Sequence, residues 1–282
     1  MLDISVVIPF KDKSSLTLGA VLSFLKFGPT VREFLLVSNN SSPSELGKIR
    51  SAVYAIKNVK ILEYNKPFNY HKMNNWAIRK ASGKFILMMN NDIEFSKNSL
   101  DIIERMLKKA SEKNVGVCGC TLLYSNQSRI QHAGVFLCPG GMAEHMYIGK
   151  SYKKALRNAG SGMFPYSIKR DLMVSAVTGA FQLVEKSKFD AINGMNESFI
   201  IGGGDVDLCI RMNKKGYQTW FIGGGYLIHK ESASRRHIPL PFSDFYNSYL
   251  SYIKSYNIAV GDPFLPKITT NMKSSFGGYD EC

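Results

Sequence analysis

The sequence lacks paired cysteines, long apolar runs and a leader segment. Its five cysteines are an odd number without zinc-type spacing, which predicts reduced thiols in a cytosolic protein rather than a disulfide framework. The apolar runs, such as Ile4–Phe10, are of strand length, whereas a helix needs about 18–20 apolar residues to span a bilayer, so a membrane-spanning protein is excluded. No basic-then-apolar stretch opens the chain, which predicts that it is not secreted.

Several motifs of rival chemistries are also missing. No Gly-x-Gly-x-x-Gly follows the first apolar run and no Gly-x-x-x-x-Gly-Lys-Ser/Thr occurs, which argues against dinucleotide and P-loop sites. No Gly-x-Ser-x-Gly supports a hydrolase nucleophile. With 282 residues and a 45% hydrophobic share, the chain can nevertheless bury a large core, and disorder is excluded for most of it.

Basic residues outnumber acidic ones. The chain has 36 Lys and Arg against 22 Asp and Glu, a formal charge of +14, and the excess is not confined to a tail. Such a charge suits a polyanionic ligand, an anionic membrane surface or nucleic acid, and by itself it does not choose among them.

The first half alternates apolar β-type runs with helix-period segments. The predicted strands are Ile4–Pro9, Glu33–Ser38, Val59–Tyr64 and Lys84–Met89. The predicted helices are Ser14–Phe27 with Ser14 or Ser15 as cap, Pro43–Ile56, His71–Ala81, and Lys97–Lys113 with an apolar stripe at Leu100, Ile103 and Leu107. This rhythm predicts an α/β fold with a mostly parallel, doubly wound sheet, which binds ligands outside the carboxyl ends of its strands.

The second half is less regular. We predict strands at Val115–Tyr124, Ile130–Leu137, Leu172–Val184, Tyr217–Ile222 and Tyr226–His229, helices at Asp205–Lys215 and Pro239–Tyr256, and a loop-like stretch at Pro139–Asp171. No repeat or long linker interrupts the chain, so we expect one continuous domain.

Two acidic segments could carry chemistry. Asn90-Asn91-Asp92 follows an apolar strand, where a carboxylate can hold a divalent ion on phosphate oxygens; the alternative is an ordinary Asn/Asp turn. Gly202-Gly203-Gly204 lets the backbone approach a ligand and delivers Asp205 and Asp207 to a helix start; the alternative is a capping aspartate with a first-turn carboxylate.

Two histidines are further candidates. His229 ends a short strand and precedes a basic run, so it could complete a metal site or be an ordinary structural histidine. His132 could bind a sugar hydroxyl or simply end a strand.

Together these segments resemble a family 2 glycosyltransferase with the GT-A fold. Ile4–Phe10 resembles the first strand of that family, whose end packs the nucleotide base, and Val37–Ser42 resembles its Val-Asp-Asn-Gly-Ser turn. Phe68–Asn75 resembles the segment before the metal strand, and Asn90-Asn91-Asp92 stands where the family has Asp-x-Asp. The resemblance implies that the nucleotide sugar is bound by Pro9, Phe10, Lys11, Ser38, Asn39, Lys72, Asn75, Asn90 and Asn91.

The second half narrows the resemblance to bacterial polysaccharide and O-antigen transferases, including rhamnosyltransferase-like proteins. The segments that carry it are Ile130–Val135, Ser175–Ala180, Asp205–Arg211 and His229–Arg235, in that order. The resemblance covers roughly residues 3–236. It implies a GT-A domain over 1–236, with a nucleotide-binding half at 1–114 and an acceptor and catalytic half at 115–236, followed by a C-terminal helix and tail at 237–282.

The chemistry implied is an inverting, metal-dependent transfer from a UDP- or dTDP-linked sugar to a hydroxyl of a saccharide or lipid-linked acceptor. Asp205 would be the general base, with Asp207 as second choice, and Asp92 and His229 would hold Mg²⁺ or Mn²⁺. His132, Thr178 and Gly179 would meet the acceptor.

Three positions depart from the family pattern. Ser38 replaces the aspartate that often reads the base, Asn90 replaces the first acid of Asp-x-Asp, and Gly204 replaces the Glu or Asn that often precedes the key aspartate. These changes bear on nucleotide preference, metal affinity and the orientation of Asp205.

Two other classes stay open. A nucleotidyltransferase would show a Gly-rich, Arg/Lys-bearing loop where this chain has Phe10–Lys13, and a non-catalytic module, either a degenerate transferase or a basic nucleic-acid binder, would suit the departures and the charge. We expect no nucleic-acid partner. The aromatic helix over Phe242–Tyr256 suggests peripheral contact with an anionic membrane on its cytoplasmic face.

Overall fold

A computed structural model describes residues 1–138, 142–157, 167–230, 239–253 and 262–264. The first half forms β1 (Leu2–Phe10), α1 (Ser14–Phe27), β2 (Val31–Ser38), α2 (Pro43–Val53), β3 (Val59–Glu63), α3 (Tyr70–Ile78) and β4 (Phe85–Met89). β4, β1, β2 and β3 lie side by side in that order, and every pair is parallel. The predicted alternation of strands and helices is confirmed here.

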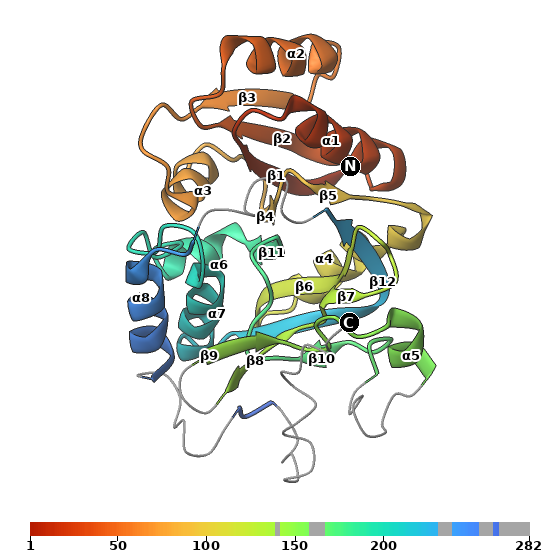
Figure 1. Ribbon diagram of the computed structural model, residues 1–282, viewed down its shortest axis with the longest axis vertical. Helices are drawn as coiled ribbons and strands as arrows, with labels where there is room; N and C mark the ends of the chain where they lie inside the picture. Colours follow the sequence, from red (N-terminus) through yellow and green to blue (C-terminus); the bar gives the residue numbers. More distant parts are fainter. Residues whose placement is uncertain (139–141, 158–166, 231–238, 254–261, 265–282) are drawn as a thin grey trace.

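The remaining elements continue the same sheet. They are β5 (Ile93–Glu94), the short 3₁₀ helix η1 (Lys97–Ser99), α4 (Ile102–Ala110), β6 (Val115–Tyr124), β7 (Ile130–His132), β8 (Val135–Cys138), β9 (Met142–His145), α5 (Tyr152–Arg157), β10 (Leu172–Met173), β11 (Phe181–Glu185), α6 (Lys186–Ala191), α7 (Gly204–Lys214), β12 (Gln218–His229) and α8 (Phe242–Ile253). The order across the sheet is β10-β12-β6-β11-β4-β1-β2-β3, with β8 and β9 as a separate hairpin (Figure 1).

β11 is the strand that departs from the mostly parallel prediction. It is antiparallel to both of its neighbours, β4 and β6, while β6 and β12 pair in parallel. The reversal places the start of β11 beside the end of β4, because Phe181 pairs with Met89. The loop before β11 therefore reaches the carboxyl edge of the sheet, where the parallel strands end.

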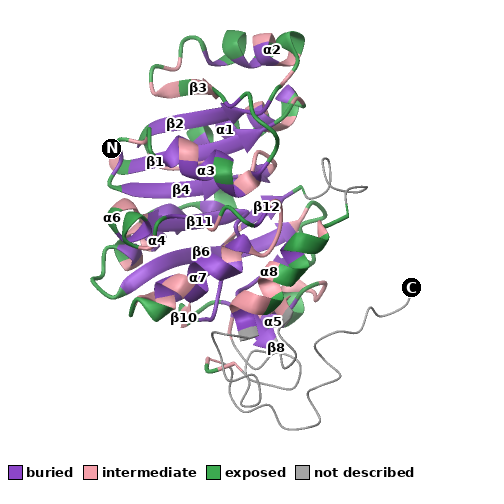
Figure 2. Cartoon of the chain, turned by 90° about the vertical axis from the view of Figure 1, so that its left-hand side faces the viewer, coloured by how far each residue is buried: buried purple, intermediate pink, exposed green. Residues whose placement is uncertain are grey.

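Two apolar clusters cover the two faces of the sheet. Side chains alternate along β1, so that Ile4, Val6 and Ile8 join α1, α2 and α4 in one cluster, and Val7 joins α3 and α7 in the other. The neighbouring strands β2, β1, β4, β11 and β6 are mostly buried, whereas β3 at the edge is only partly buried, and the helices carry the exposed faces (Figure 2).

The cap of α1 differs from the prediction. The N-cap is Lys13, in the left-handed region with φ 48°, and its side chain makes no cap hydrogen bond. The backbone N–H of Ser14 donates instead to Glu45 Oε2 in α2, at 2.7 Å. A carboxylate from the neighbouring helix thus replaces the predicted serine cap. At α2 itself, Ser42 caps the helix and Pro43 begins it.

Several predicted boundaries after β4 are wrong for local backbone reasons. The predicted helix from Lys97 divides at Asp101, where φ is 65°, and Leu100 is 55% exposed rather than part of an apolar stripe. The predicted strand from Ile130 divides at Gly134, where φ is 102°. Leu172–Val184 is two strands rather than one, and the predicted break before Tyr226 is a bulge within one strand.

The stretch predicted as loop-like, Pro139–Asp171, contains β9 and α5. Residues 139–141 and 158–166 of this stretch lie outside the described residues, as do the last three residues of the predicted aromatic helix, 254–256. α6 was not predicted. Within the described ranges, no helix combines the length and apolar character needed to cross a membrane.

Three cysteine thiols are free and buried: Cys118, Cys120 and Cys209. Cys118 and Cys120 belong to the same apolar cluster, because residues two apart on β6 share a face of the strand. Burial raises the pKa of Cys209 to about 12. The side chain of Cys138 and the whole of Cys282 lie outside the described residues.

Candidate active site

The ends of β1 and β2 form the edge where nucleotide contacts are predicted. Phe10 pairs with Ser38, and both are buried. The backbone N–H of Asn39 donates to the carbonyl of Phe10, while its side-chain amide donates to the carbonyls of Tyr64 and Lys66 at 3.0 and 2.9 Å. Asn39 therefore fixes the loop after β3. Pro9 is buried and Lys11 exposed at the same edge.

Two further predicted nucleotide contacts lie on α3. Lys72 is exposed in the first turn, whereas Asn75 is buried and is used within the protein. The Asn75 amide accepts from the N–H of Met195 at 2.9 Å and donates to the carbonyl of Met195 at 2.9 Å and to Glu197 Oε1 at 3.0 Å. This amide joins α3 to the segment before α7.

Asp92 and His229 meet at the carboxyl edge, with Asp92 Oδ1 and His229 Nε2 3.1 Å apart. Nδ1 of His229 lies 2.6 Å from Gln131 Oε1, and because that oxygen can only accept, Nδ1 carries the proton. The contact with Asp92 is then an ion pair only if the ring takes a second proton. In the neutral ring, a nitrogen lone pair faces Asp92 Oδ1, a buried oxygen with no hydrogen-bond donor in the described structure.

The two asparagines before Asp92 point in different directions. Asn90 Nδ2 lies 3.4 Å from His229 Nε2, and Asn90 Oδ1 lies 3.3 Å from the hydroxyl of Tyr70. Asn91 turns away from this cluster and donates to Thr17 Oγ1 in α1 at 3.1 Å. Asn90 therefore lies beside the Asp92–His229 pair, and Asn91 ties the strand end to α1.

The loop before β11 connects the parts of the site. The N–H of Gly179 donates to Asp205 Oδ2 at 2.7 Å, and its carbonyl accepts from the Tyr70 hydroxyl at 3.0 Å. The carbonyl of Ala180 accepts from the N–H of Asn90 at 2.9 Å. This short loop thus links the base candidate Asp205 to the end of β4, which precedes Asp92.

Asp205 and Asp207 lie in different surroundings. Asp205 is half-buried at the start of α7, with Oδ1 accepting from the N–H of Val206 at 3.0 Å. Asp207 is buried, forms an ion pair with Arg211 Nε at 2.6 Å and accepts from Ser251 Oγ at 2.7 Å. The two carboxylates diverge as their two-residue spacing predicts, and Asp205 is the one that borders the open cavity.

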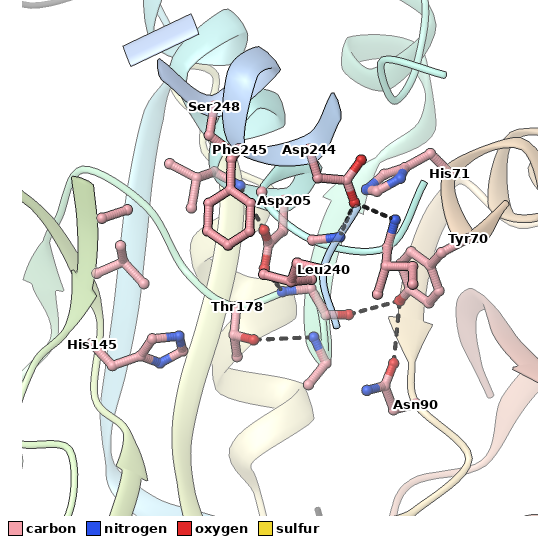
Figure 3. A pocket seen from close by; sticks show the side chains of 18 of the residues that line it. Tyr70, His71, Asn90, His145, Thr178, Asp205, Leu240, Asp244, Phe245 and Ser248 are labelled. Atoms are coloured by element: carbon pink, nitrogen blue, oxygen red, sulfur yellow. Dashed lines mark hydrogen bonds between the residues drawn. The ribbon is translucent and has the colours of Figure 1, made fainter. Parts of the chain in front are cut away.

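A cavity of about 560 Å³ lies between these elements (Figure 3). Its lining includes five predicted site residues: Asn90, Thr178, Gly179, Asp205 and His229. Figure 3 shows Asn90 and Tyr70 on one side and His145 on the other, with Thr178 and Asp205 between them. Asp92 and the remaining predicted site residues lie outside the lining.

His132, predicted as an acceptor contact, is fully buried behind the cavity wall. Its Nε2 accepts from the N–H groups of Gly134 and Thr178 at 3.3 and 3.4 Å, and its Nδ1 lies 3.0 Å from Nδ1 of His145. Burial, reinforced by the nearby His145 and His229, holds the pKa of His132 well below its usual range, so the ring is neutral. His132 then donates from Nδ1 to His145, and His145 is the member of the pair that lines the cavity.

Sequence reasoning missed Tyr70, His71, Gln131, His145 and Asp244. His71 is buried beside the start of α7, with its Nδ1 3.0 Å from the carbonyl of Phe199. Burial lowers the pKa of His71, an effect that the charge of Asp205 opposes. Tyr70, His71 and Gln131 lie inside segments that carry the family resemblance, so their neighbours could have drawn attention to them; no sequence signal marks Asp244.

Comparisons with known proteins agree with this architecture. Residues 5–165 match the model of glycosyl transferase family 2. The chain is 33% identical over 262 residues to the O-antigen biosynthesis protein RfbC of Myxococcus xanthus, a match that covers 93% of this chain and 20% of that protein. It is 32% identical over 63 residues to the rhamnosyltransferase WbbL of Escherichia coli K12, covering 22% of this chain and 24% of that protein.

Among solved structures, GalNAc-T7 with UDP, GalNAc and Mn²⁺ is similar with a TM-score of 0.63 and 14% identity, over 81% of this chain and 44% of that chain. Likeness at this identity concerns the fold, and it confirms the expected GT-A architecture. The chain spans about a fifth to a quarter of the length of the curated relatives named above.

Proposed function

The chain belongs to glycosyl transferase family 2, and from this premise we propose that it transfers a sugar from a UDP- or dTDP-linked donor to a hydroxyl of a saccharide or lipid-linked acceptor, with inversion at the anomeric carbon. The acceptor would belong to surface polysaccharide synthesis, since the relatives include an O-antigen biosynthesis protein and a rhamnosyltransferase. The observation that carries the proposal is that Asn90, His229 and Asp205 line one cavity.

Asp92 and His229 fit a divalent cation. A buried carboxylate oxygen without a donor faces a nitrogen lone pair at 3.1 Å, and a cation satisfies both groups. The hydrogen bond from His229 Nδ1 to Gln131 fixes the ring and its tautomer, so that Nε2 is left with a lone pair for a metal ion. Among the described residues, no three His, Cys, Asp or Glu side chains form a ready-made metal centre, so the diphosphate would supply further ligands. Mg²⁺ or Mn²⁺ bound here would act as a Lewis acid that stabilises the departing diphosphate.

Asp205 is the base in this proposal. Its two oxygens each accept one backbone N–H and keep further lone pairs for the acceptor hydroxyl. A positioned base typically contributes about 10²–10⁴-fold, or about 3–5 kcal/mol of barrier. Asp207 is the weaker candidate, because its oxygens are engaged by Arg211 and Ser251.

A thermal-shift panel tests the donor and the metal together. UDP, dTDP, GDP and CDP are each added with and without Mn²⁺. A ligand at a hundred times its dissociation constant adds about 2.7 kcal/mol of stability, which raises the melting temperature by several degrees. We expect one nucleotide to give a shift that requires Mn²⁺. No shift with any of them, in a folded sample, would favour a non-catalytic binding module, and a salt-sensitive shift with RNA would identify a nucleic-acid binder.

Two substitutions separate the proposed roles. Asp205→Asn should lower the turnover rate at least about 10²-fold and leave the metal-dependent thermal shift with nucleotide intact. Asp92→Ala should weaken both. Asp190→Asn is a matched control, since this exposed carboxylate pairs with Lys186 away from the cavity. Equal loss of nucleotide binding in the Asp92 and Asp205 variants would contradict this division of roles.

Membrane contact is a separate proposal carried by α8. Four of its aromatic side chains are half or more exposed: Phe242, Phe245, Tyr246 and Tyr249. Together with the +14 charge, this face suits an anionic bilayer that presents a lipid-linked acceptor. Flotation with vesicles containing phosphatidylglycerol tests it: we expect co-migration at low salt that Phe242→Ser with Tyr246→Ser reduces. Absence of co-migration at low salt would refute the contact.

A further inference from the structure

The three glycines before Asp205 are closely approached by the protein's own side chains. A Cβ at Gly202 would lie 2.9 Å from Leu240, just before α8, and a Cβ at Gly203 would lie 2.3 Å from Ser248 Oγ in α8. A Cβ at Gly204 would lie 2.1 Å from His71 Nε2 in α3. Gly203 also has a φ of 85°, which favours glycine. The run of glycines thus lets α8 and α3 pack directly onto the loop that leads to Asp205.

Asp244, in the first turn of α8, binds this loop through both of its oxygens. Oδ1 accepts from the N–H of Ile200 at 2.8 Å, and Oδ2 accepts from the N–H groups of Ile201 and Gly202 at 2.8 and 3.0 Å. The residue is 1% exposed. Figure 3 shows Asp244 on the α8 side of the cavity, above the loop. Three donors on one buried carboxylate are the partners that an ionised carboxylate requires when it is removed from water.

The last turn of α8 contacts residues on both sides of Asp205 in the sequence. The hydroxyl of Tyr252 donates to the carbonyl of Gly203 at 3.4 Å, and Ser251 Oγ donates to Asp207 at 2.7 Å. Tyr252 is buried as well. Contacts from α8 therefore precede and follow Asp205 in the sequence, so the position of its carboxylate depends on where α8 lies.

We propose that Asp244 is a positioning residue for the transfer reaction, which fixes the loop 200–204 so that the Asp205 carboxylate faces the acceptor hydroxyl. The proposal rests on the proposed role of Asp205 as base. Its physical basis is geometric: a displacement of about 1 Å at a reacting group can cost about 10²-fold in rate. On this view α8 contributes to catalysis without touching the reacting atoms.

The test compares Asp244→Ala and Asp244→Asn with the wild type by amide hydrogen exchange over residues 199–205 and by turnover. Asp244→Ala removes all three acceptor contacts, so we expect the amides of Ile200, Ile201 and Gly202 to exchange at least about tenfold faster. Asp244→Asn keeps one acceptor oxygen, so at least one of these amides should be accelerated. Turnover is followed as hydrolysis of UDP-N-acetylglucosamine if the thermal-shift panel selects UDP, or of dTDP-glucose if it selects dTDP. In either case kcat should fall by about 10–100-fold, with KM within about twofold.

Asn247→Ala is the matched control. It lies on the same helix and its amide donates to the carbonyl of Ser198 at 3.0 Å, just before the loop. This variant should keep wild-type kcat and exchange at residues 200–202. Unchanged exchange in Asp244→Ala would overturn the proposal, as would a fall in kcat matched by an equal loss of the Mn²⁺-dependent nucleotide shift.

Failure of the proposed function gives a different result. It would appear as a wild type without turnover or nucleotide-dependent shift. The exchange rates would still decide the contact in that case: acceleration in both Asp244 variants supports the fixing of the loop by α8, and wild-type rates refute it.

Discussion

The two parts of the sheet hold their ends together in different ways. In β1–β4 the strands pair in parallel and are linked by helices, two of which have local side-chain caps, Ser42 at α2 and Asn69 at α3. In β6–β12 one strand, β11, is antiparallel to both of its neighbours. The site contacts of this part join residues far apart in the chain, with Gln131 and His229 separated by 98 positions and Asn90 and His229 by 139.

The difference has a physical cause. Each parallel pair from β1 to β3 is joined by a single helical crossover, so strands that follow one another in the sequence are also neighbours in the sheet. Contacts between distant residues form only after the chain has been brought together, so they depend on the whole fold. The first part is therefore suited to a preformed edge for a nucleotide. In the second part, the position of each side chain depends on several elements at once.

The buried carboxylate of Glu33 stabilises the β1–β4 part of the sheet, and its removal should have the largest effect on stability. The carboxylate accepts hydrogen bonds from Ser5, Ser82 and Lys60. These bonds join β2 to β1, to the turn before β4 and to β3, respectively. Burial alone would raise the pKa of Glu33, but these hydrogen bonds outweigh it and lower the pKa from 4.5 to about 2. Because the folded pKa is depressed, the stabilisation is present above pH 4.5 and is lost as the pH falls toward 2.

We expect Glu33→Gln to lower the free energy of unfolding at pH 7 by about 3 kcal/mol. Urea unfolding from pH 7 to pH 2 measures this: the wild-type and variant curves should converge as the pH approaches 2, since the wild-type carboxylate is then protonated. Glu63→Gln, which removes an exposed ion pair with Arg50, is the control and should have little effect. A constant gap down to pH 2 would contradict the prediction.

Asp207 is the corresponding test in the second part. Replacing it by Asn removes the ion pair that holds Arg211, whose guanidinium also donates to the carbonyls of Ile192 and Gly194. We expect the free energy of unfolding to fall by about 2 kcal/mol, because the partly buried guanidinium of Arg211 is left without its counter-charge.

Below the melting temperature, turnover of Asp207→Asn should stay well above that of Asp205→Asn. Urea unfolding and a kcat measurement check the two parts of the prediction, with Asp190→Asn, an exposed partner of Lys186, as the control. If folded Asp207→Asn lost as much turnover as Asp205→Asn, the assignment of Asp205 rather than Asp207 as the base would be contradicted.

The smallest expected change in stability comes from Gly19, which contrasts with the tightly packed Gly204 in the second part. Gly19 lies within α1, and a Cβ there would meet nothing within 4 Å. Gly19→Ala should stabilise the protein by about 0.5–1 kcal/mol, because alanine loses less backbone freedom in a helix. Thermal unfolding measures it. Gly204→Ala is the contrasting variant, since its Cβ would meet His71; stabilisation there would contradict the close packing described for that loop.

The alternating architecture, the sheet edge at which the site lies and the segments that resemble the family could all be predicted from the sequence. Periodic apolar residues and local caps decide these features, so α1 and β4 were predicted with bounds at or next to those observed. The candidate residues Asn90, Thr178, Gly179, Asp205 and His229 were also named from the sequence, and they line one cavity.

Only the tertiary structure decided how these residues are held. The reversal of β11 brings Gly179 to Asp205, His132 supports His145 from behind the cavity wall, and Asp244 in α8 fixes the glycine loop. None of these contacts leaves a local pattern, because each joins elements that are distant in the sequence. Their energies come from burial and hydrogen bonding that exist only once the sheet is assembled.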